Sequence, residues 1–573
     1  MSASSKKKLR KEQAAANMTE KQLAAKKEEK QLKIYTASFW IVLVLCVCLV
    51  AGMALKGPVI GMTRMITTAA VVNDTMKLSA VELNYFYIDA INNYCNQYSS
   101  YLSYFLDTSK PINEQFYDET NKITWDQEFL DMALESAKNN YALYNAAKAA
   151  GHTLTEEEKK SSEDLFKQLK TAAKSYGYAT SGGYLKALYG NGASLSSYKA
   201  YYEITSLASS YYAAYTKQLE EAIDNDALRE FEADKMYEFN SYTYASHYMT
   251  VDSFKEGGTK DDKGNMTYSD EEIKAAEAAV KAAAEALAVP ENNTLEALNA
   301  AIAAASKTSA TTATADEATK DQAAKNTATE NKDVKYSSVN TAVQEWIRDD
   351  ARKPGDIAAL PYTTTSTVDD KEVETLKGYY VVLFQDVNDN NFALKDVRHI
   401  LVSYEGGTTD ENGSTTYSDE QKNAAKEKAE AILKDWEAGA KTEESFADLA
   451  KEKTTDSGSK ENGGLYEAIY PGQMVTAFND WCFDDARKVG DTGIVQTDYG
   501  YHVMYFSGDN ETSYRDYMVK NALLEKNTTD WQEALNEATT IEAKNTNHID
   551  RDMILGSGSS SATEDSHEGH DHD

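Results

Sequence analysis

The sequence predicts an α+β protein in which a helical region is followed by two copies of a smaller domain of strands and helices. Apolar and aromatic residues recur every three or four positions over residues 57–240, as they do in amphipathic helices. A block of strand-like and helix-like segments then occurs twice, over residues 241–390 and 391–510. A chain of 573 residues is long enough for several separate cores.

Tyrosine-rich stripes mark the predicted helices of residues 57–240. One helical face of LNYFYIDAINNYCNQYSSYLSYF carries Tyr87, Ile91, Tyr94, Tyr98, Tyr101 and Phe105. The chain holds 38 Tyr but only 15 Phe, and a tyrosine ring combines apolar contact area with a polar hydroxyl. The stripes are therefore interpreted first as seams between packed helices, and second as a cradle for unfolded chains.

An apolar stretch near the N-terminus predicts one transmembrane helix over residues 34–56. The run from Ile34 to Leu55 is long enough to span a bilayer. Residues 1–33 are rich in lysine, so the positive-inside rule places this tail in the cytoplasm and everything after Leu55 outside. Because this charged segment is longer than that of a usual signal peptide, a retained anchor is favoured over a cleaved one.

Charge and cysteine content exclude several classes of protein. The formal net charge of −33 argues against nucleic acid as a partner, since phosphates would be repelled. Four cysteines without metal-ligand spacing make neither a disulfide scaffold nor a zinc module, and a Cys95–Cys482 bridge stays open. Residues 556–573 are predicted to be a flexible acidic tail. Its histidines could hold a divalent metal weakly, but a solvated tail is favoured.

The two copies share an ordered set of segments. Each opens with a histidine-bearing strand, and His247 and His399 are taken as equivalent residues, 152 positions apart. Each continues through TYSDE into a helix, then carries W-x-x-D-D-A-R-K and a β-rich run, GYYVVLF or GYHVMYF. The first copy also contains a segment rich in alanine and threonine, residues 275–335, which we interpret as a partly helical, partly disordered surface insert.

Several residues of the second copy are candidates for a site. His399 lies on the first predicted strand and His502 on the last, so the two rings can meet if these strands are neighbours in one sheet. Asp456 precedes a turn rich in glycine and serine. Met474 and Phe478 are spaced i and i+4, which predicts that they share one helical face.

The motifs of the second copy occur in the order found in one family. They are RHIL, Asp456 before the double glycine, GQM with Phe478, and finally G-x-H. Residues 395–507 resemble a parvulin-type peptidyl-prolyl isomerase domain, which implies an antiparallel sheet flanked by helices. The whole chain after the apolar stretch resembles the PrsA- and SurA-type foldases. That resemblance implies a SurA-N-like helical chaperone region over residues 57–240, opening with a strand, a turn and a helix from Ala70 and completed by residues 511–555.

The resemblance also implies roles for the site residues. His399 and His502 fall on the paired histidines of the family, Asp456 falls on its cysteine or aspartate, and Met474 and Phe478 fall on the residues that line the proline pocket. We favour the histidines as a tautomer-fixing pair over proton-transfer groups. The sequence departs from the family pattern at LYE after the double glycine and at Tyr499 near the last histidine.

The first copy lacks most of these residues. Tyr380 stands at the position of His502, while Val339 and Val343 stand at those of Met474 and Phe478. The segment with the aspartate and the double glycine has no counterpart. We therefore predict that residues 241–390 keep the fold and have lost isomerase activity.

The predicted protein is a single-pass, membrane-anchored foldase outside the cytoplasm of a Gram-positive-type bacterium. It is expected to bind unfolded secreted polypeptides and to isomerise their X-Pro bonds without a metal or organic cofactor. The alternative is a non-catalytic holdase in which both small domains are scaffolds. The sequence leaves open whether the chain forms a homodimer.

Overall fold

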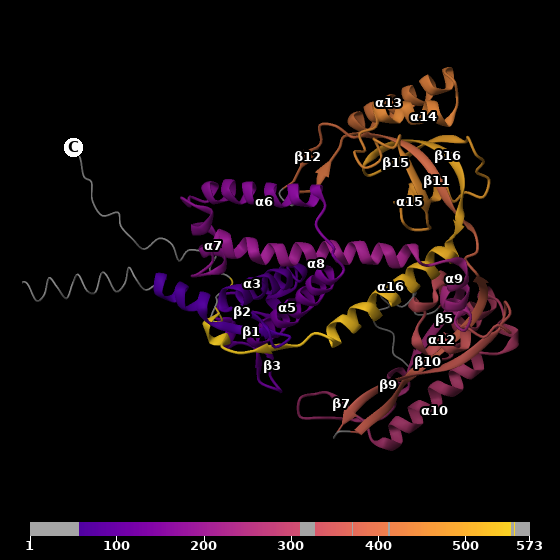
Figure 1. Cartoon of the computed structure of the whole chain (residues 1–573). Helices are drawn as coiled ribbons and strands as arrows, with labels where there is room; N and C mark the ends of the chain where they lie inside the picture. The colour runs from indigo at the N-terminus through magenta and orange to yellow at the C-terminus, as the bar shows by residue number, and fades with distance from the viewer. Residues whose placement is uncertain are drawn as a thin grey trace, which may run out of the picture. The chain divides into compact units, whose positions relative to one another are not determined.

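The computed structural model describes residues 57–309, 327–368, 371–410, 413–549, 551 and 555 (Figure 1). The predicted basic tail 1–33, the transmembrane segment 34–56 and the acidic tail 556–573 lie outside these residues. Within the described ranges, we find no helix with the length and apolar character needed to cross a membrane.

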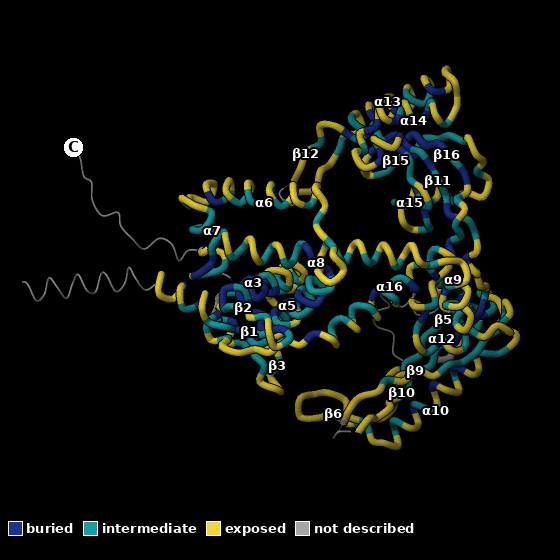
Figure 2. Tube along the Cα trace, viewed as in Figure 1, coloured by how far each residue is buried: buried dark blue, intermediate teal, exposed yellow. Residues whose placement is uncertain are grey.

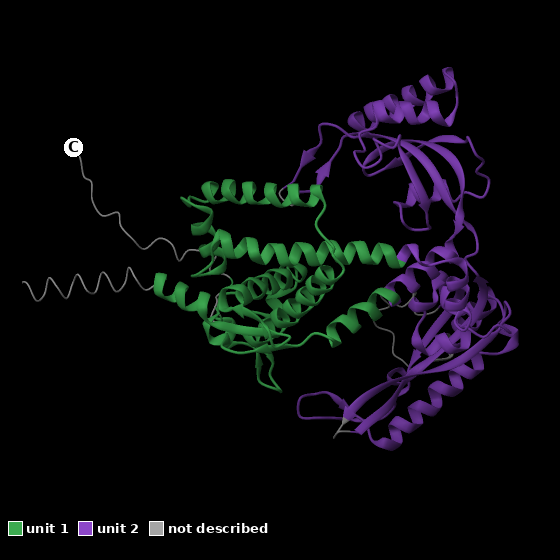
Figure 3. Cartoon of the chain, viewed as in Figure 1, with its two compact units in different colours: residues 1–219, 527–573 green, residues 220–526 purple. Residues whose placement is uncertain are grey.

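The chain forms two compact units, which Figure 3 colours separately. Among the described residues, unit 1 comprises those up to Leu219 together with those from Asn527 onward, and unit 2 comprises those from Glu220 to Lys526. The predicted helical region was bounded at residue 240, so the division falls about twenty residues earlier in the chain. Both copies of the repeat belong to unit 2.

A small antiparallel sheet in unit 1 joins the two ends of the described chain. Its strand order is β17 (Ile541–Ala543), β1 (Thr68–Val72) and β2 (Met76–Ser79). The chain then enters α3 (Ala80–Gln97), whose first turn is closed by a capping box between Ser79 and Glu82. The expected opening of strand, turn and helix is thus confirmed, and a strand from the C-terminal segment completes the sheet.

Two helices supply most of the unit 1 core. Helix α3 packs against α5 (Trp125–Ala149), and dark blue segments of both mark buried residues in Figure 2. The predicted single face from Tyr87 to Phe105 is wrong, because α3 ends at Gln97 and a separate short helix, α4, follows. The unit also contains helical residues 57–66, α4 (Leu102–Phe105), β3 (Phe116–Asp118), β4 (Ile123–Thr124), α6 (Glu156–Ser175), α7 (Ser181–Tyr189) and α8 (Leu195–Glu221), whose last two residues belong to unit 2.

The first copy of the repeat is a four-stranded antiparallel sheet in the order β8–β5–β10–β9. Its strands are β5 (Ser241–Thr250), β8 (Thr329–Lys335), β9 (Ile357–Val368) and β10 (Lys371–Asn388). Its helices are α10 (Asp270–Leu287), α11 (Leu295–Ser309) and α12 (Thr341–Ile347). Helix α9 (Asn225–Glu232) precedes it, and the hairpin β6 (Thr259–Lys260) and β7 (Met266–Thr267) lies beyond β5.

The second copy repeats this topology as β14–β11–β16–β15. Its strands are β11 (Ala393–Ser403), β14 (Leu465–Ile469), β15 (Thr492–Thr497) and β16 (Gly500–Ser513), with a small hairpin of β12 (Thr408–Thr409) and β13 (Thr415–Thr416). Its helices are α13 (Asp419–Ala438), α14 (Glu443–Lys453) and α15 (Thr476–Cys482), and α16 (Tyr514–Glu537) follows the last strand. The internal repeat is therefore confirmed at the level of strand order.

The matched topology corrects the predicted insert at residues 275–335. Most of that range forms elements that the second copy also has: α10 corresponds to α13, α11 to α14, and β8 to β14. The prediction took the alanine-rich composition as a sign of a surface insert. Alanine also favours helices and allows close packing on a sheet, and Ala276 and Ala284 of α10 are buried in this way. Residues 310–326, in the middle of this segment, lie outside the described ranges.

The strand register identifies the residue of the first copy that corresponds to His399. The fifth residues of GYYVVLF and GYHVMYF are Val382 and Met504. Val382 pairs with Ser246 in β5, whereas Met504 pairs with His399 in β11. Ser246 therefore occupies the position of His399, and the predicted equivalence of His247 and His399 is wrong by one residue. Because side chains alternate along a strand, this slip places His247 on the opposite face of its sheet.

A buried arginine hydrogen-bonds to the chain segments that lead into β5 and out of β10. Arg515, at the start of α16, is 7% exposed, and its guanidinium donates to the carboxylate of Glu232 at 2.7 Å. It also donates to the side chain of Asn240 and to the backbone oxygens of Asp389 and Met236, each at 2.9 Å. These partners precede β5 or follow β10, so one side chain fixes the entrance to the first copy and the exit from both.

Candidate active site

Two histidines meet on one face of the second sheet. His399 in β11 and His502 in β16 stand on adjacent antiparallel strands, two register positions apart and therefore on the same face of the sheet. Their Nδ1 atoms lie 3.0 Å apart, and the ring centroids are 5.2 Å apart with near-parallel planes. Both side chains are buried, at 3% and 6% exposure. The expected meeting of the two rings is thus confirmed.

Asp456 holds the other end of this pair. Its Oδ2 lies 3.0 Å from His399 Nε2 and accepts a hydrogen bond from the Tyr466 hydroxyl at 3.1 Å. Ser459, 1% exposed, donates to the same oxygen, and its Oγ lies 3.1 Å from His399 Nε2. The backbone N–H of Gly458 donates to Asp456 Oδ1 at 3.1 Å. Four donors therefore converge on a single carboxylate.

This carboxylate fixes the tautomer of both histidines. An ionised carboxylate only accepts, so His399 Nε2 carries the proton and His399 Nδ1 is an acceptor. His502 Nδ1 must then donate to His399, which leaves His502 Nε2 to accept from the hydroxyl of Thr497 at 2.9 Å. The result is a hydrogen-bond chain that runs in one direction, from Thr497 through His502 and His399 to Asp456.

Burial and hydrogen bonding set the protonation states along this chain. Burial lowers the pKa of His399, although Asp456 partly opposes the effect. Burial and the neighbouring His399 lower the pKa of His502 to about 4. Burial alone would raise the pKa of Asp456, but hydrogen bonds from Ser459, Gly458, His399 and Tyr466 outweigh it and lower that pKa to about 2. At neutral pH the site therefore holds one negative charge and two neutral imidazoles.

The lowered pKa of His502 predicts a pH-dependent stability. As the pH drops below about 6.5, His502 is protonated in the unfolded chain but stays neutral in the folded domain. The free energy of unfolding therefore decreases with decreasing pH until the folded pKa of about 4 is reached. The loss is expected to be up to about 3 kcal/mol. Denaturant unfolding of the full chain between neutral pH and about pH 4 measures it, and His502→Asn is expected to flatten the slope. An equally steep slope in that variant would contradict the assignment.

An aromatic wall stands beside the histidines. Phe478 in α15 packs edge-on against His399 and His502, with ring centroids 5.6 and 5.3 Å away. Tyr466 lies 5.0 Å from the His399 ring, and Met474 packs against the same cluster. The predicted i, i+4 helical pair is wrong, because α15 begins at Thr476 and Met474 lies in the turn before it. Tertiary packing, not helical spacing, brings the two side chains together.

The double glycine is required by close backbone contact. Gly464 has φ +74° and its carbonyl accepts from the His399 N–H at 2.8 Å, so a Cβ there would lie 2.2 Å from the His399 carbonyl oxygen. Gly464→Ala is expected to destabilise the domain by about 1–3 kcal/mol more than Gly472→Ala. Gly472 has a similar φ of +82° but no neighbouring atom within 4 Å, so it isolates the cost of the backbone conformation. Equal unfolding free energies for the two variants would refute the contact.

Three polar residues of this network were missed as site residues by sequence reasoning. Ser459 lies within the segment that follows Asp456, and Thr497 lies five residues before His502. Hydroxyl residues are frequent in turns, so neither position stood out. Tyr466 was noted only as a departure from the family pattern, yet its hydroxyl reaches Asp456. A search for hydroxyl donors near both histidines would have found them.

The first copy carries a different set of side chains at the corresponding positions. Tyr380 replaces His502 and stacks on Tyr248 at 4.5 Å, and its hydroxyl accepts from Asn340 at 3.3 Å. Val339 and Val343 occupy the positions of Met474 and Phe478 in the equivalent cluster, as expected. No histidine pair forms here, because the partner position is Ser246 and His247 faces away.

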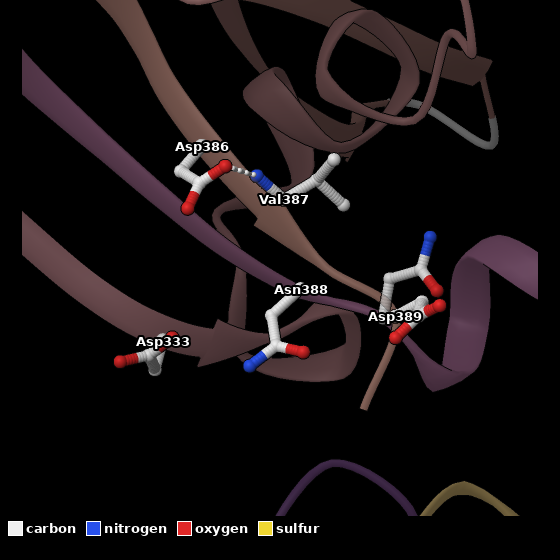
Figure 4. A pocket seen from close by; sticks show the side chains of 6 residues that line it. Asp333, Asp386, Val387, Asn388 and Asp389 are labelled. Carbon is white, nitrogen blue, oxygen red and sulfur yellow. Dashed lines mark hydrogen bonds between the residues drawn. The ribbon is translucent and has the colours of Figure 1, made fainter. Parts of the chain in front are cut away.

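A polar cleft elsewhere in unit 2 does not resemble this site. It is lined by Asn240, Asp333, Asp386, Val387, Asn388 and Asp389, at one end of the first sheet (Figure 4). Its side chains include neither an aromatic ring nor a histidine, and Val387 is its one apolar lining residue, so it lacks the groups of the histidine site. In the described part of the chain, we find no group of three or more His, Cys, Asp or Glu side chains placed to hold a metal ion.

The fold and the site together define a class. Residues 371–508 match the PPIC-type PPIASE domain family, so this part of the chain is a parvulin-type peptidyl-prolyl isomerase domain. The match begins with β10, the last strand of the first sheet, and ends within β16.

Within this class, the chain is PrsA-like. It is 35% identical over 145 residues to foldase protein PrsA 2 of Listeria monocytogenes, covering 25% of this chain and 38% of that protein. It is 31% identical over 166 residues to foldase protein PrsA of Staphylococcus epidermidis, covering 28% and 47%. The chain thus spans less than half the length of these curated relatives. A solved structure of PrsA from Bacillus anthracis covers 26% of this chain and 59% of its own, at 24% identity and a TM-score of 0.16.

Proposed function

We propose that this protein is a foldase anchored in the cell membrane of a Gram-positive-type bacterium, with the bulk of the chain outside the cytoplasm. It catalyses the cis–trans isomerisation of X-Pro bonds in secreted polypeptides. The lysine-rich N-terminal tail, the apolar stretch of residues 34–56 and the similarity to PrsA foldases support this proposal.

The observation that carries the proposal is the hydrogen-bond chain that ends on Asp456 beside the Phe478 ring. Rotation about a prolyl amide crosses a barrier of roughly 18–20 kcal/mol, because the resonance of the amide must be broken. No covalent step is needed. A site accelerates the rotation if it binds the twisted amide more tightly than the planar amide.

Asp456 supplies the electrostatic part of this preference. A planar amide carries partial negative charge on its oxygen, and that charge decreases as the amide twists and resonance is lost. A fixed carboxylate near the oxygen therefore disfavours the planar form relative to the twisted one. The neutral histidines hold the carboxylate in place without adding a positive charge that would cancel it.

Phe478, Met474 and Tyr466 supply the apolar part. They would hold the pyrrolidine ring and exclude water, which strengthens the interaction of the substrate with the carboxylate. His399, Asp456 and His502 are therefore proposed as the polar residues of the site, and Met474 and Phe478 as its proline-binding residues. The first copy would bind or space client chains without turnover.

A refolding experiment distinguishes the foldase from a passive holdase. The full chain is added to a secreted protein whose refolding is limited by prolyl isomerisation, and both the refolding rate and aggregation are followed. We expect wild type to speed refolding, and Phe478→Ala to lose this effect while still suppressing aggregation. If wild type suppresses aggregation with no gain in refolding rate, the holdase alternative is correct.

A further inference from the structure

The helix formed by residues 57–66 has one face that is packed against unit 1 (indigo in Figure 1). Gly61 is buried there, and a Cβ at this position would lie only 2.9 Å from the backbone nitrogen of Gly192. Arg64, one turn further along the same face, is 3% exposed. The helix therefore has a defined rotation about its own axis.

A second face of this helix is apolar and exposed. Val59, Met62, Met65 and Ile66 are 59%, 66%, 55% and 78% exposed. At 3.6 residues per turn, these four side chains fall within an arc of about 120°. Gly61 and Arg64 lie outside this arc, about 40° and 100° beyond its edge at Met65. The four residues are called the apolar stripe below.

The solvent-facing side of a surface helix normally carries polar residues, whereas the apolar stripe carries none. A helix on the surface of a soluble domain turns its polar residues outward, and a contiguous exposed apolar face marks an interaction site. Because the packed face is fixed by the Gly61–Gly192 contact, the helix cannot rotate to hide the stripe. A surface outside unit 1 must cover it.

The position of the helix in the chain identifies that surface. Only Lys56 stands between Gly57 and Leu55, the last residue of the apolar stretch. At no more than about 3.6 Å per residue, Gly57 lies within about 7 Å of Leu55. If residues 34–56 span the bilayer, as proposed above, the described part of the helix lies at its outer boundary.

We propose that residues 57–66 form an interfacial helix, whose apolar stripe inserts between the headgroups and acyl chains of the outer surface of the membrane. This inference rests on the proposed membrane anchor and adds a second contact to it. The packed face joins the helix to the rest of unit 1. The inserted stripe would therefore hold unit 1 against the membrane, whereas the anchor alone would leave the unit free to move away from it.

Depth measurements on the full-length chain test this proposal. Single cysteines are introduced as Val59→Cys, Met62→Cys and Ile66→Cys in a chain whose four native cysteines are alanine, with the fold checked by circular dichroism. Each is labelled with an environment-sensitive fluorophore and reconstituted into vesicles of mixed phosphatidylcholine and phosphatidylglycerol. Tyr176→Cys is the matched control, because Tyr176 is 70% exposed in the same unit.

We expect blue-shifted emission and quenching by lipids that carry a nitroxide on the acyl chain at all three stripe positions, and neither effect at residue 176. Carbonate extraction of the same vesicles reports separately on the anchor. If the chain resists extraction but the stripe labels report water, the anchor stands and the interfacial helix is refuted. Labels that are shielded from water but not quenched by the lipids would indicate a protein partner and would also refute it. If the chain is extracted, the anchor fails, and the interfacial helix fails with it.

Discussion

Replacing Asp456 with alanine is expected to lower kcat/KM for X-Pro isomerisation by about 100-fold, because the variant lacks the one fixed charge of the site. It also leaves His399 Nε2 without its carboxylate acceptor, so the tautomers of both histidines are no longer fixed. Asp456→Asn keeps the shape of the side chain and removes the charge, and we expect a loss of similar size. Exchange spectroscopy on a proline-containing peptide measures the rate.

The matched control is Asp480→Ala, which removes an exposed carboxylate from α15 in the same domain. Its kcat/KM is expected to equal that of wild type. Wild-type turnover by Asp456→Ala, with the fold verified, would exclude Asp456 from the site. Wild-type turnover by Asp456→Asn together with loss in Asp456→Ala would assign the carboxylate a role in shape and hydrogen bonding, not charge.

Replacing Arg515 with alanine is expected to destabilise unit 2 by about 3–5 kcal/mol, because it leaves the half-buried Glu232 carboxylate and two backbone oxygens without this donor. Arg515→Lys is expected to recover only part of this, since an ammonium group cannot reproduce the planar fork of donors. Because a two-domain unit need not unfold in one step, the measurement is hydrogen exchange at the amides around residues 389–391 and 513–516.

Arg229→Ala is the control for this prediction. Arg229 pairs with Asp226 at 3.6 Å on α9, but the two side chains are 76% and 94% exposed. Exposed pairs contribute at most about 1 kcal/mol, so exchange rates at the junction should remain close to those of wild type. Equal effects of the two substitutions would show that Arg515 does not hold the junction together.

Strand alternation and an ordered set of motifs were sufficient to predict the core of the site. His399 and His502 each lie on a strand of clear apolar alternation, and adjacent strands of one sheet bring alternating residues together. The separation of the two residues along the chain did not matter, because the family pattern supplied the order of the elements.

The same alternation explains the largest error. In a strand, a shift of one residue reverses the face of every side chain, and matching His247 to His399 by residue type introduced such a shift. The register places Ser246 at that position. The first copy therefore retains neither histidine of the pair.

Contacts between distant segments could not be predicted from local pattern. Met474 and Phe478 have helical spacing but meet through packing around a turn, and Thr497 reaches His502 across a hairpin. Arg515 and Glu232 are 283 residues apart, and nothing in either neighbourhood distinguishes them from surface charges. Such pairs become visible only when the fold defines which chain segments converge.

The central claim is that the second small domain is an active isomerase and the first is not. Its most direct test is exchange spectroscopy of cis–trans interconversion in a proline-containing peptide, with the full chain at catalytic concentration, for wild type and the double variant Asp456→Ala/His502→Asn. We predict that wild type accelerates exchange and that the double variant, which leaves the first copy intact, returns it to the uncatalysed rate. An unaccelerated rate with folded wild type, or undiminished acceleration by the double variant, would contradict the claim.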